Sequence, residues 1–238
     1  MLKRPKLNLA AFAVPILLAV AGVAASREDG KSARVEMPLN LAILIQDDLV
    51  SHVGNELRVT RDFIQSLPEG SRVMVGYIRS GSLQVRQPFT SNLVEAANGL
   101  RTPVSSTSAS PFNPYVEVLE ALRSFDSEGK NPNALLLISD GLDTSRGFDA
   151  ATVLHSIDLE RAIKEANRRK VAIYSFYAPS VGLTSRSRLA ASYGQSSLNR
   201  LSDETRGKAF FEGLNDFVTF NSHFERLVEA LNERYSEY

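Results

Sequence analysis

The chain has 238 residues, of which 43% are hydrophobic and 23% charged, and it contains no cysteine. This composition excludes collagen-like, coiled-coil and wholly disordered chains, and the lack of cysteine excludes disulfides, a thiolate nucleophile and an iron–sulfur cluster. Basic and acidic side chains both number 27, but Lys3, Arg4 and Lys6 precede the first acidic residue, so residues 26–238 carry a net charge of −3. That charge does not indicate a nucleic-acid-binding protein.

The first 25 residues are typical of a bacterial export signal. A basic stretch, Met1 to Lys6, precedes an uncharged run of 17 residues, Leu9 to Ala25, that ends in small side chains. Val23 and Ala25 supply the residues that a processing peptidase needs at positions −3 and −1. An uncleaved N-terminal anchor is the alternative. Either way, we expect the rest of the chain to cross the inner membrane into the periplasm or beyond.

Residues 37–235 are expected to form one α/β domain after a polar linker over residues 26–36. Short apolar runs of strand length alternate with longer stretches of helical spacing. The predicted strands are Leu39–Ile45, Arg72–Ile78, Leu83–Val85, Ala134–Ile138, Val171–Ala178 and Lys208–Phe211. Three of them lack polar alternation, which is typical of strands buried on both faces of a mostly parallel sheet.

Four helices are predicted from apolar residues that recur every three or four positions. They run through Leu57–Leu67, Tyr115–Phe125, Leu159–Ala166 and Phe220–Leu231. Alternating strands and helices with short connections predict a doubly wound, three-layer α/β sandwich with helices on both faces of the sheet. Ligands of such folds bind outside the carboxyl ends of the strands.

Three loops are expected at that edge: Gln46–Ser51, the Ser/Thr/Pro tract Thr102–Pro111, and Ser139–Ser145. Together with the strand-turn segment LLLISDGLD and the segment LNRLSDETRGKAFF at Leu198–Phe211, they resemble the von Willebrand factor A-type (VWA) domains of exported bacterial proteins. The resemblance covers about residues 37–235 and implies a Rossmann-type fold. In that family the three loops form a metal-ion-dependent adhesion site, in which a D-x-S-x-S motif, a Thr and an Asp bind Mg²⁺ and a partner's carboxylate completes the shell.

The metal motif of the first loop is incomplete in this sequence, and two registers are open. One aligns Asp47-x-Leu49-x-Ser51 with the motif, which places Leu at the first hydroxyl position. The other aligns Gln46-x-Asp48-x-Val50, which replaces the Asp by an amide and lacks both serines. Each missing side-chain oxygen must be replaced by water, because Mg²⁺ prefers six oxygen ligands.

The other two loops give one clear match. Asp140 occupies the family's Asp-Gly turn, and Asn113 stands in register with the family's Thr, with Ser108 or Ser110 as alternatives. If Mg²⁺ or Ca²⁺ binds, we expect weak binding by Asp140 with Asp47 or Asp48, Ser51 and the Asn113 position. The alternative for Asp140 is a structural turn in which its carboxylate accepts backbone N–H bonds. The adjacent Asp47 and Asp48, with no Arg or Lys near them in the sequence, are expected to repel one another unless a cation or a basic partner is present.

Recognition of a partner is assigned to loops at the same edge. Ser180–Ser197 is predicted to be a long loop after the fifth strand, and long loops are often binding elements. Its Arg186, Arg188 and Tyr193 are candidates for contact with an acidic partner, and Asp143 adds negative potential nearby. A solvated loop without a binding role is the alternative.

An enzymatic function is not expected. His52, His155 and His223 lie in no metal motif, and the sequence has neither a nucleotide-binding glycine motif nor a G-x-S-x-G elbow. The sequence therefore predicts an exported protein-binding or assembly module of the bacterial envelope, with no certain cofactor and an unidentified protein partner. Three alternatives are a Mg²⁺-dependent adhesion domain that binds an acidic partner, a hydrolase that uses Ser51, His52 and Asp140, and a purely structural subunit of a larger envelope assembly. Membrane contact is expected only through the N-terminal segment.

Overall fold

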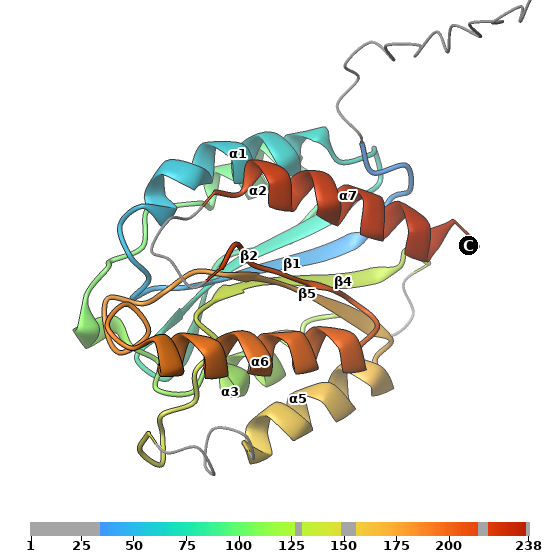
Figure 1. The fold of residues 1–238 in the computed structure, drawn as a ribbon. Helices are drawn as coiled ribbons and strands as arrows, with labels where there is room; N and C mark the ends of the chain where they lie inside the picture. The colour runs from blue at the N-terminus through green and yellow to red at the C-terminus, as the bar shows by residue number, and fades with distance from the viewer. Residues whose placement is uncertain (1–33, 127–129, 149–155, 214–218, 237–238) are drawn as a thin grey trace, which may run out of the picture. The chain divides into compact units, whose positions relative to one another are not determined.

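A computed structural model describes residues 34–126, 130–148, 156–213 and 219–236. They form a three-layer α/β sandwich, as the alternation of strands and helices predicts (Figure 1). The predicted export signal over residues 1–25 and His155 lie outside the described residues. Within the described residues, no helix is both long and apolar enough to cross a lipid bilayer.

The middle layer is a six-stranded sheet in the order β3-β2-β1-β4-β5-β6. Every neighbouring pair is parallel except β2 and β3, which are antiparallel. The strands are β1 (Asn40–Gln46), β2 (Arg72–Arg79), β3 (Ser82–Thr90), β4 (Asn133–Ser139), β5 (Val171–Tyr177) and β6 (Ala209–Phe210). The predicted fold class is therefore confirmed. Each predicted strand is found, and all but β3 lie within two residues of the expected bounds.

The burial of each strand explains how completely the sequence predicts it. Every residue of β1 and β5 is buried, and so is all of β4 after its first residue, which accounts for their continuous apolar runs. In contrast, β3 lies at an edge of the sheet and is largely exposed. Only its start, Leu83–Val85, carries an apolar signal, so the sequence predicts three of its nine residues.

The helices cover both faces of the sheet. They are α1 (Val53–Ser66), α2 (Leu93–Asn98), α3 (Pro114–Leu122), α5 (Ile157–Arg168), α6 (Arg188–Glu204) and α7 (Asn221–Tyr235), with a short 3₁₀ turn at Thr107–Ala109. The helices α1, α2 and α7 pack on one face, and α3, α5 and α6 pack on the other (Figure 1). Each face buries its own apolar core against the sheet, which is why the sheet's central strands are mostly apolar on both sides.

The expectation of a long loop over Ser180–Ser197 is wrong from Arg188 onward, where α6 begins. Ser187 caps the helix by accepting a hydrogen bond from the Ala190 backbone N–H at 3.2 Å. The buried face of its first turns consists of small residues, which give little apolar periodicity. A Cβ on Gly194 would lie 2.0 Å from the Asp140 backbone oxygen, so only glycine lets α6 pack this closely on the turn after β4.

Candidate functional site at the carboxyl ends of the strands

A hollow of about 210 Å³ lies where β1, β4 and β5 end. Its polar lining includes Gln46 and Asp48 after β1, Ser110 ahead of α3, and Asp140 after β4. The apolar side chains of Phe112 and Leu183 also line it. The three loops that the sequence assigns to the edge of the sheet therefore meet at one point, together with the loop after β5.

Gln46 connects the parts of this hollow by hydrogen bonds. Its Oε1 accepts from Ser139 Oγ at 2.5 Å and from the Asp140 backbone N–H at 3.3 Å. Its Nε2 donates to Asp48 Oδ1 at 2.7 Å. Of the two registers open for the first loop, the structure therefore places Gln46-x-Asp48-x-Val50 at the site.

Two buried carboxylates, Asp48 and Asp140, share the hollow. Asp140 Oδ1 accepts from the Leu142 backbone N–H and Oδ2 from Thr184 Oγ1, each at 3.1 Å. Burial raises the pKa of Asp140, and burial together with the negative charge of Asp140 raises the pKa of Asp48 to about 6. Among the described ion pairs none reaches either carboxylate, so a pair with 2% and 4% exposure lacks a compensating cation.

Asp47 lies one residue before Asp48, but two arginines lie next to its carboxylate. The expectation that it has no neighbouring cation is therefore wrong. Arg101 Nη1 and Nη2 donate to its two carboxylate oxygens at 2.6 and 2.9 Å, and Arg79 Nε lies 3.7 Å away. The Val104 backbone N–H also donates to Oδ1 at 3.0 Å. Asp47 thus ties β1 to the segment ahead of α3 and does not line the hollow.

The remaining predicted ligands lie elsewhere. Asn113 caps α3, where its Oδ1 accepts from the Tyr115 backbone N–H at 3.1 Å and its Nδ2 donates to Asp158 at 2.9 Å. Ser51 is exposed in the turn before α1 and does not line the hollow. Of the five predicted ligands the structure therefore brings together Asp48 and Asp140, and it adds Ser110, an alternative to Asn113.

These residues do not fit the magnesium site of the VWA family. The Gln46 amide stands at the motif's carboxylate position, its oxygen already accepts two hydrogen bonds, and its NH₂ group points at Asp48. In the described parts of the chain, no three His, Cys, Asp or Glu side chains are placed to hold a metal. Mg²⁺ needs about six oxygens in near-octahedral geometry, and the hollow offers two carboxylates that are both engaged in hydrogen bonds.

The predicted partner-binding residues are spread around the hollow. Asp143 accepts from Ser156 Oγ at 2.6 Å and from the Ser145 backbone N–H at 3.0 Å, so it orders the loop after β4. Arg186 is exposed in the loop after β5, and Arg188 is exposed in the first turn of α6. Tyr193 lies half-buried on α6, where its ring is 6.1 Å from that of Phe148.

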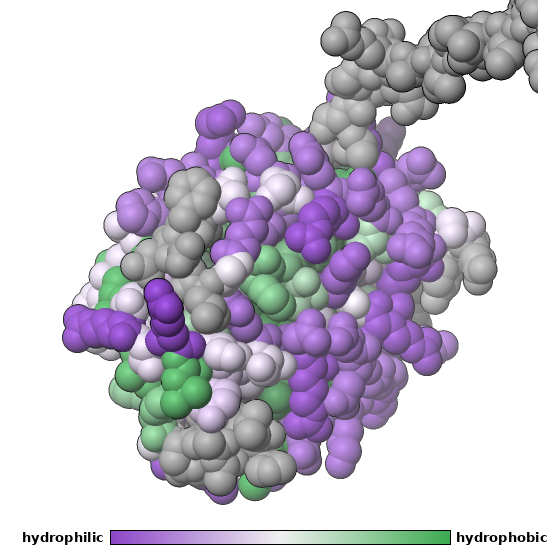
Figure 2. Space-filling view, in the orientation of Figure 1, coloured by the Kyte–Doolittle hydropathy of each residue, from purple (hydrophilic) through white to green (hydrophobic). Residues whose placement is uncertain are grey.

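Exposed apolar side chains lie at this end of the sheet, and we call Phe112, Leu183 and Leu189 the apolar rim. Phe112 and Leu183 line the hollow, and Leu189 lies in the first turn of α6. Phe112 is 60% exposed and Leu189 56% exposed. In Figure 2, apolar surface gathers at the left end of the molecule, where the strands end and α6 begins. Phe112 and Leu183 therefore place exposed apolar side chains at a hollow that also has polar and acidic lining.

The backbone at Phe112 is held in an uncommon conformation. Its φ is +60°, in the left-handed region that disfavours a bulky residue. Its carbonyl accepts from the Thr144 backbone N–H at 2.6 Å and from Thr144 Oγ1 at 3.3 Å. The loop before α3 is thereby fixed to the loop after β4, and the aromatic ring is presented to solvent on a rigid support.

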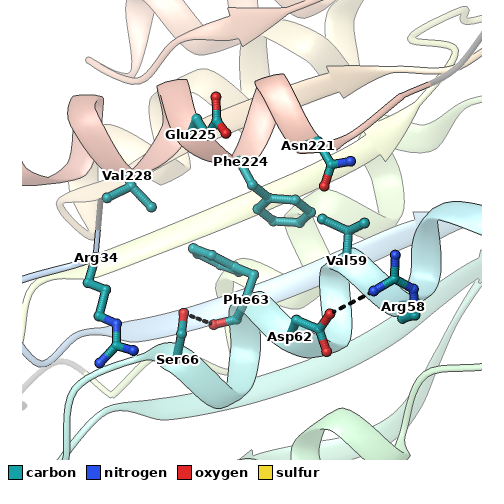
Figure 3. Close-up of a pocket in the computed structure, with 10 residues that line it drawn as sticks. All are labelled: Arg34, Arg58, Val59, Asp62, Phe63, Ser66, Asn221, Phe224, Glu225 and Val228. Atoms are coloured by element: carbon teal, nitrogen blue, oxygen red, sulfur yellow. Dashed lines mark hydrogen bonds and ion pairs between the residues drawn. The ribbon is translucent and has the colours of Figure 1, made fainter. Parts of the chain in front are cut away.

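A second hollow, of about 290 Å³, lies between α1 and α7 (Figure 3). The rings of Phe63 and Phe224 stack at 4.5 Å between centroids and join the two helices. The exposed Arg58 and Asp62 form an i,i+4 ion pair at 3.4 Å. Two of its charged groups therefore pair along a helix surface, which is ordinary for an amphipathic helix.

Sequence reasoning missed four residues that organise the carboxyl edge: Gln46 as the hydrogen-bond centre, Arg101 as the partner of Asp47, Thr184 as a donor to Asp140, and Phe112 on the apolar rim. Gln46 carried a readable signal, since it ends an apolar strand at the motif's Asp position. Arg101 and Thr184 are 54 and 44 residues away from the carboxylates they contact, so only the fold reveals them.

No family model matches the chain, and no curated protein matches its sequence. Among solved structures, the conserved hypothetical protein BatB from Bacteroides thetaiotaomicron is 14% identical over 84% of this chain and 100% of that one, with a TM-score of 0.59. An aerotolerance-related membrane protein from Bacteroides fragilis, bearing multiple mutations to serine, is 13% identical over 82% of this chain and 99% of that one, with a TM-score of 0.56. The SpRpn10 VWA domain also aligns, with 12% identity over 77% of this chain and 100% of that one, at a TM-score of 0.43.

The similarities to the two Bacteroides structures support the class of fold seen here: a mostly parallel α/β sheet covered by helices on both faces. More narrowly, the fold of this chain is VWA-like, as the residues at its first, fourth and last strands predict.

Proposed function

We propose that this chain is an exported protein-binding module that recognises a protein partner through the carboxyl edge of its sheet and does so without a bound metal. The observation that carries the proposal is the apolar rim, which exposes Phe112, Leu183 and Leu189 beside the polar hollow. Aromatic and aliphatic side chains in such a setting are typical anchors of protein interfaces.

The conformation of Phe112 supports a role in recognition. A non-glycine residue in the left-handed region costs about 1 kcal/mol or more, and such strain concentrates at functional sites. Within the fold, the ring of Phe112 is largely exposed and so gains little from burial. A partner that covers this ring offsets the cost by burying its apolar area.

Independence from metal is the second part of the proposal. The Gln46 amide occupies a position that the family's magnesium site gives to a carboxylate, and Asp47 is already neutralised by Arg101. The Mg²⁺-dependent adhesion domain remains the alternative. The hydrolase alternative finds little support, because Ser51 and His52 are exposed and neither lines the hollow that holds Asp140.

Export across the inner membrane is the third part, and it rests on the basic, apolar and small-residue regions of residues 1–25. The B. fragilis neighbour is itself described as a membrane protein, which agrees with an envelope location. Expression of the full chain in a bacterium should yield a periplasmic product that begins at Ser26, as N-terminal sequencing will show. A product retained in the cytoplasm with Met1 intact would contradict export.

Site-specific photo-crosslinking tests the recognition surface. A photoreactive phenylalanine analogue placed at Phe112 or Leu183 should give one discrete protein adduct in the producing cells. The same analogue at Val94, which is 58% exposed on α2 and lies on the other face of the sheet, is the matched control and should give none.

The chelator arm of the same experiment separates the two adhesion hypotheses. We expect the adduct at Phe112 to form equally with and without EDTA. Loss of the adduct in EDTA would favour the Mg²⁺-dependent alternative, and equal labelling at Phe112 and Val94 would contradict the proposed surface.

A further inference from the structure

A third hollow, of about 390 Å³, lies far from the carboxyl edge, between the turn that joins α6 to β6 and the C-terminal part of α7. Figure 1 shows both elements at the right of the view, opposite the loops of the apolar rim. Arg206 and Lys208 come from the turn, and Glu233 and Arg234 come from α7. Tyr174 of β5 forms part of the lining beneath them.

The charge of this hollow is unbalanced. Three cationic side chains and one carboxylate line it, and none of the ion pairs within the described residues involves Arg206, Lys208 or Arg234. The only side-chain hydrogen bond described for these three runs from Arg234 Nη1 to the Arg206 backbone oxygen, at 3.0 Å. The guanidinium of Arg234 is thereby fixed against the turn, while Arg206 and Lys208 stay exposed at its mouth.

Two donor groups in the lining of this hollow have no acceptor in the described structure. Tyr174 is 1% exposed and its hydroxyl has no hydrogen-bond partner, and the buried Nε of Arg234 also has none. Buried polar groups without partners are rare in proteins and call for an explanation such as a ligand. Burial raises the pKa of Tyr174, so its hydroxyl keeps its proton and is available as a donor.

The turn is built to hold its two cations in place. A Cβ on Gly207 would lie 1.9 Å from the Ile173 backbone oxygen, so the glycine lets the turn lie directly against β5. The Lys208 carbonyl accepts from the Ser175 backbone N–H at 3.1 Å and fixes the next residue as well. Arg206 has a φ of +63°, which directs the chain sharply into this close approach.

We propose that this hollow binds a phosphate group, held by the Tyr174 hydroxyl, the Arg234 Nε–H and the side chains of Arg206 and Lys208. The three cations and Glu233 leave a net charge of about +2, which matches a phosphate dianion. Arginine and lysine donors that approach from several directions suit a tetrahedral oxyanion with three or four acceptor oxygens. The hollow is larger than one phosphate ion, so it has room for a phosphomonoester.

Titration calorimetry of the full chain tests this site, with inorganic phosphate and glycerol phosphate as probes at constant ionic strength. We expect both probes to bind with millimolar affinity or better, and glycerol phosphate at least as tightly as inorganic phosphate. Tyr174→Phe should weaken binding about tenfold, as expected for the loss of one hydrogen bond to a charged group. The same substitution removes an unpaired buried hydroxyl, so the free protein should not lose thermal stability.

Lys208→Gln and Lys164→Gln form a matched pair, because both remove one exposed positive charge. Lys164 lies on α5, on the other face of the sheet, so its substitution should leave phosphate affinity within about twofold, whereas Lys208→Gln should weaken it about tenfold. No binding of either probe by the full chain at about 10 mM would overturn the proposal. Binding that Tyr174→Phe and Lys208→Gln leave unchanged would overturn it as well.

Discussion

Asp47 and Asp48 are adjacent in the sequence and both are almost fully buried, yet their surroundings are opposite. Asp47 is clamped by the Arg101 guanidinium, which also lies 4.0 Å over the Tyr77 ring, and Arg79 is nearby. Asp48 faces a second buried carboxylate, Asp140, and has only uncharged hydrogen-bond donors around it. A paired cation offsets much of the cost of burying a carboxylate, and a carboxylate without one keeps that cost. Two adjacent residues of the same type therefore differ: Asp47 is held in an ion pair and Asp48 is not.

The largest effect is expected when the clamp at Asp47 is broken. Arg101→Gln leaves the fully buried Asp47 with only the more distant Arg79, and removal of one partner from a buried pair costs about 4 kcal/mol of unfolding free energy. Urea denaturation at pH 7 measures this loss.

A double variant shows whether the cost comes from an unpaired charge. Asp47→Asn in the Arg101→Gln background neutralises the carboxylate and should recover about half of the lost stability. If the double variant is as unstable as Arg101→Gln alone, the cost arises from lost packing of Arg101 on Tyr77 instead.

In contrast to Arg101→Gln, Asp48→Asn should raise the free energy of unfolding, and the size of this gain should depend on pH. The folded-state pKa of Asp48, about 6, exceeds the ordinary value of 3.8, so the folded protein holds a proton that the unfolded chain releases between these values. The free energy of unfolding therefore falls as the pH rises from about 4 to 6 and stays lowered above that range. Asp48→Asn removes this fall and should stabilise the protein at pH 8 by up to about 3 kcal/mol, and by little at pH 4.

Denaturation curves at pH 4 and pH 8 in EDTA measure the difference. Glu117→Gln offers a comparison away from the hollow, because burial raises the pKa of Glu117 on α3 to about 7. It too should stabilise more at pH 8 than at pH 4. A gain from Asp48→Asn that is equal at both pH values would show that folding does not raise the pKa of Asp48.

The fold could be predicted from the sequence to a greater extent than the site. Continuous apolar strands such as Ala134–Ile138 can only be buried on both faces, so they determine the layered sheet whatever the details of the loops. The start of α6 could not be found this way, because it packs through small residues such as Ala190 and Gly194. Their role depends on how closely two backbones approach, which periodicity does not report.

The site depends on partners that are distant in the sequence. Adjacent carboxylates at Asp47 and Asp48 look alike in a sequence, and both are plausible ligands. Their roles separate only because Arg101 reaches one and Asp140 the other once the strands are side by side. Phe112 gave no sequence signal either, since a positive φ at a bulky residue contradicts local preference and appears only in the folded backbone.

A smaller effect is expected for a substitution on the apolar rim, because it relieves backbone strain at Phe112 and changes no charge. Phe112→Asn places in the left-handed region a residue that tolerates it, and it removes an exposed ring that the fold does not use. We expect the free energy of unfolding, measured by thermal denaturation, to rise by about 0.5 kcal/mol. The crosslinked adduct at Leu183 should also be lost. Val94→Asn on α2 is the matched control and should change neither quantity. A clear loss of stability in Phe112→Asn would mean that the ring packs within the fold.

The smallest expected effect is that of divalent cations on the unaltered chain. A ligand that binds only the folded state raises stability by RT ln(1 + [L]/Kd). The Gln46 amide therefore predicts no melting shift at millimolar Mg²⁺, Mn²⁺ or Ca²⁺.

Gln46→Asp sharpens the test, because it adds a third carboxylate beside Asp48 and Asp140. Without a cation this variant should melt below the unaltered chain, since three buried carboxylates repel one another. With Mg²⁺ it should recover, which would show that the Gln46 amide is what keeps the metal out of the hollow. A Mg²⁺ shift in the unaltered chain that Asp140→Ala removes would instead show that the hollow binds the metal despite the amide.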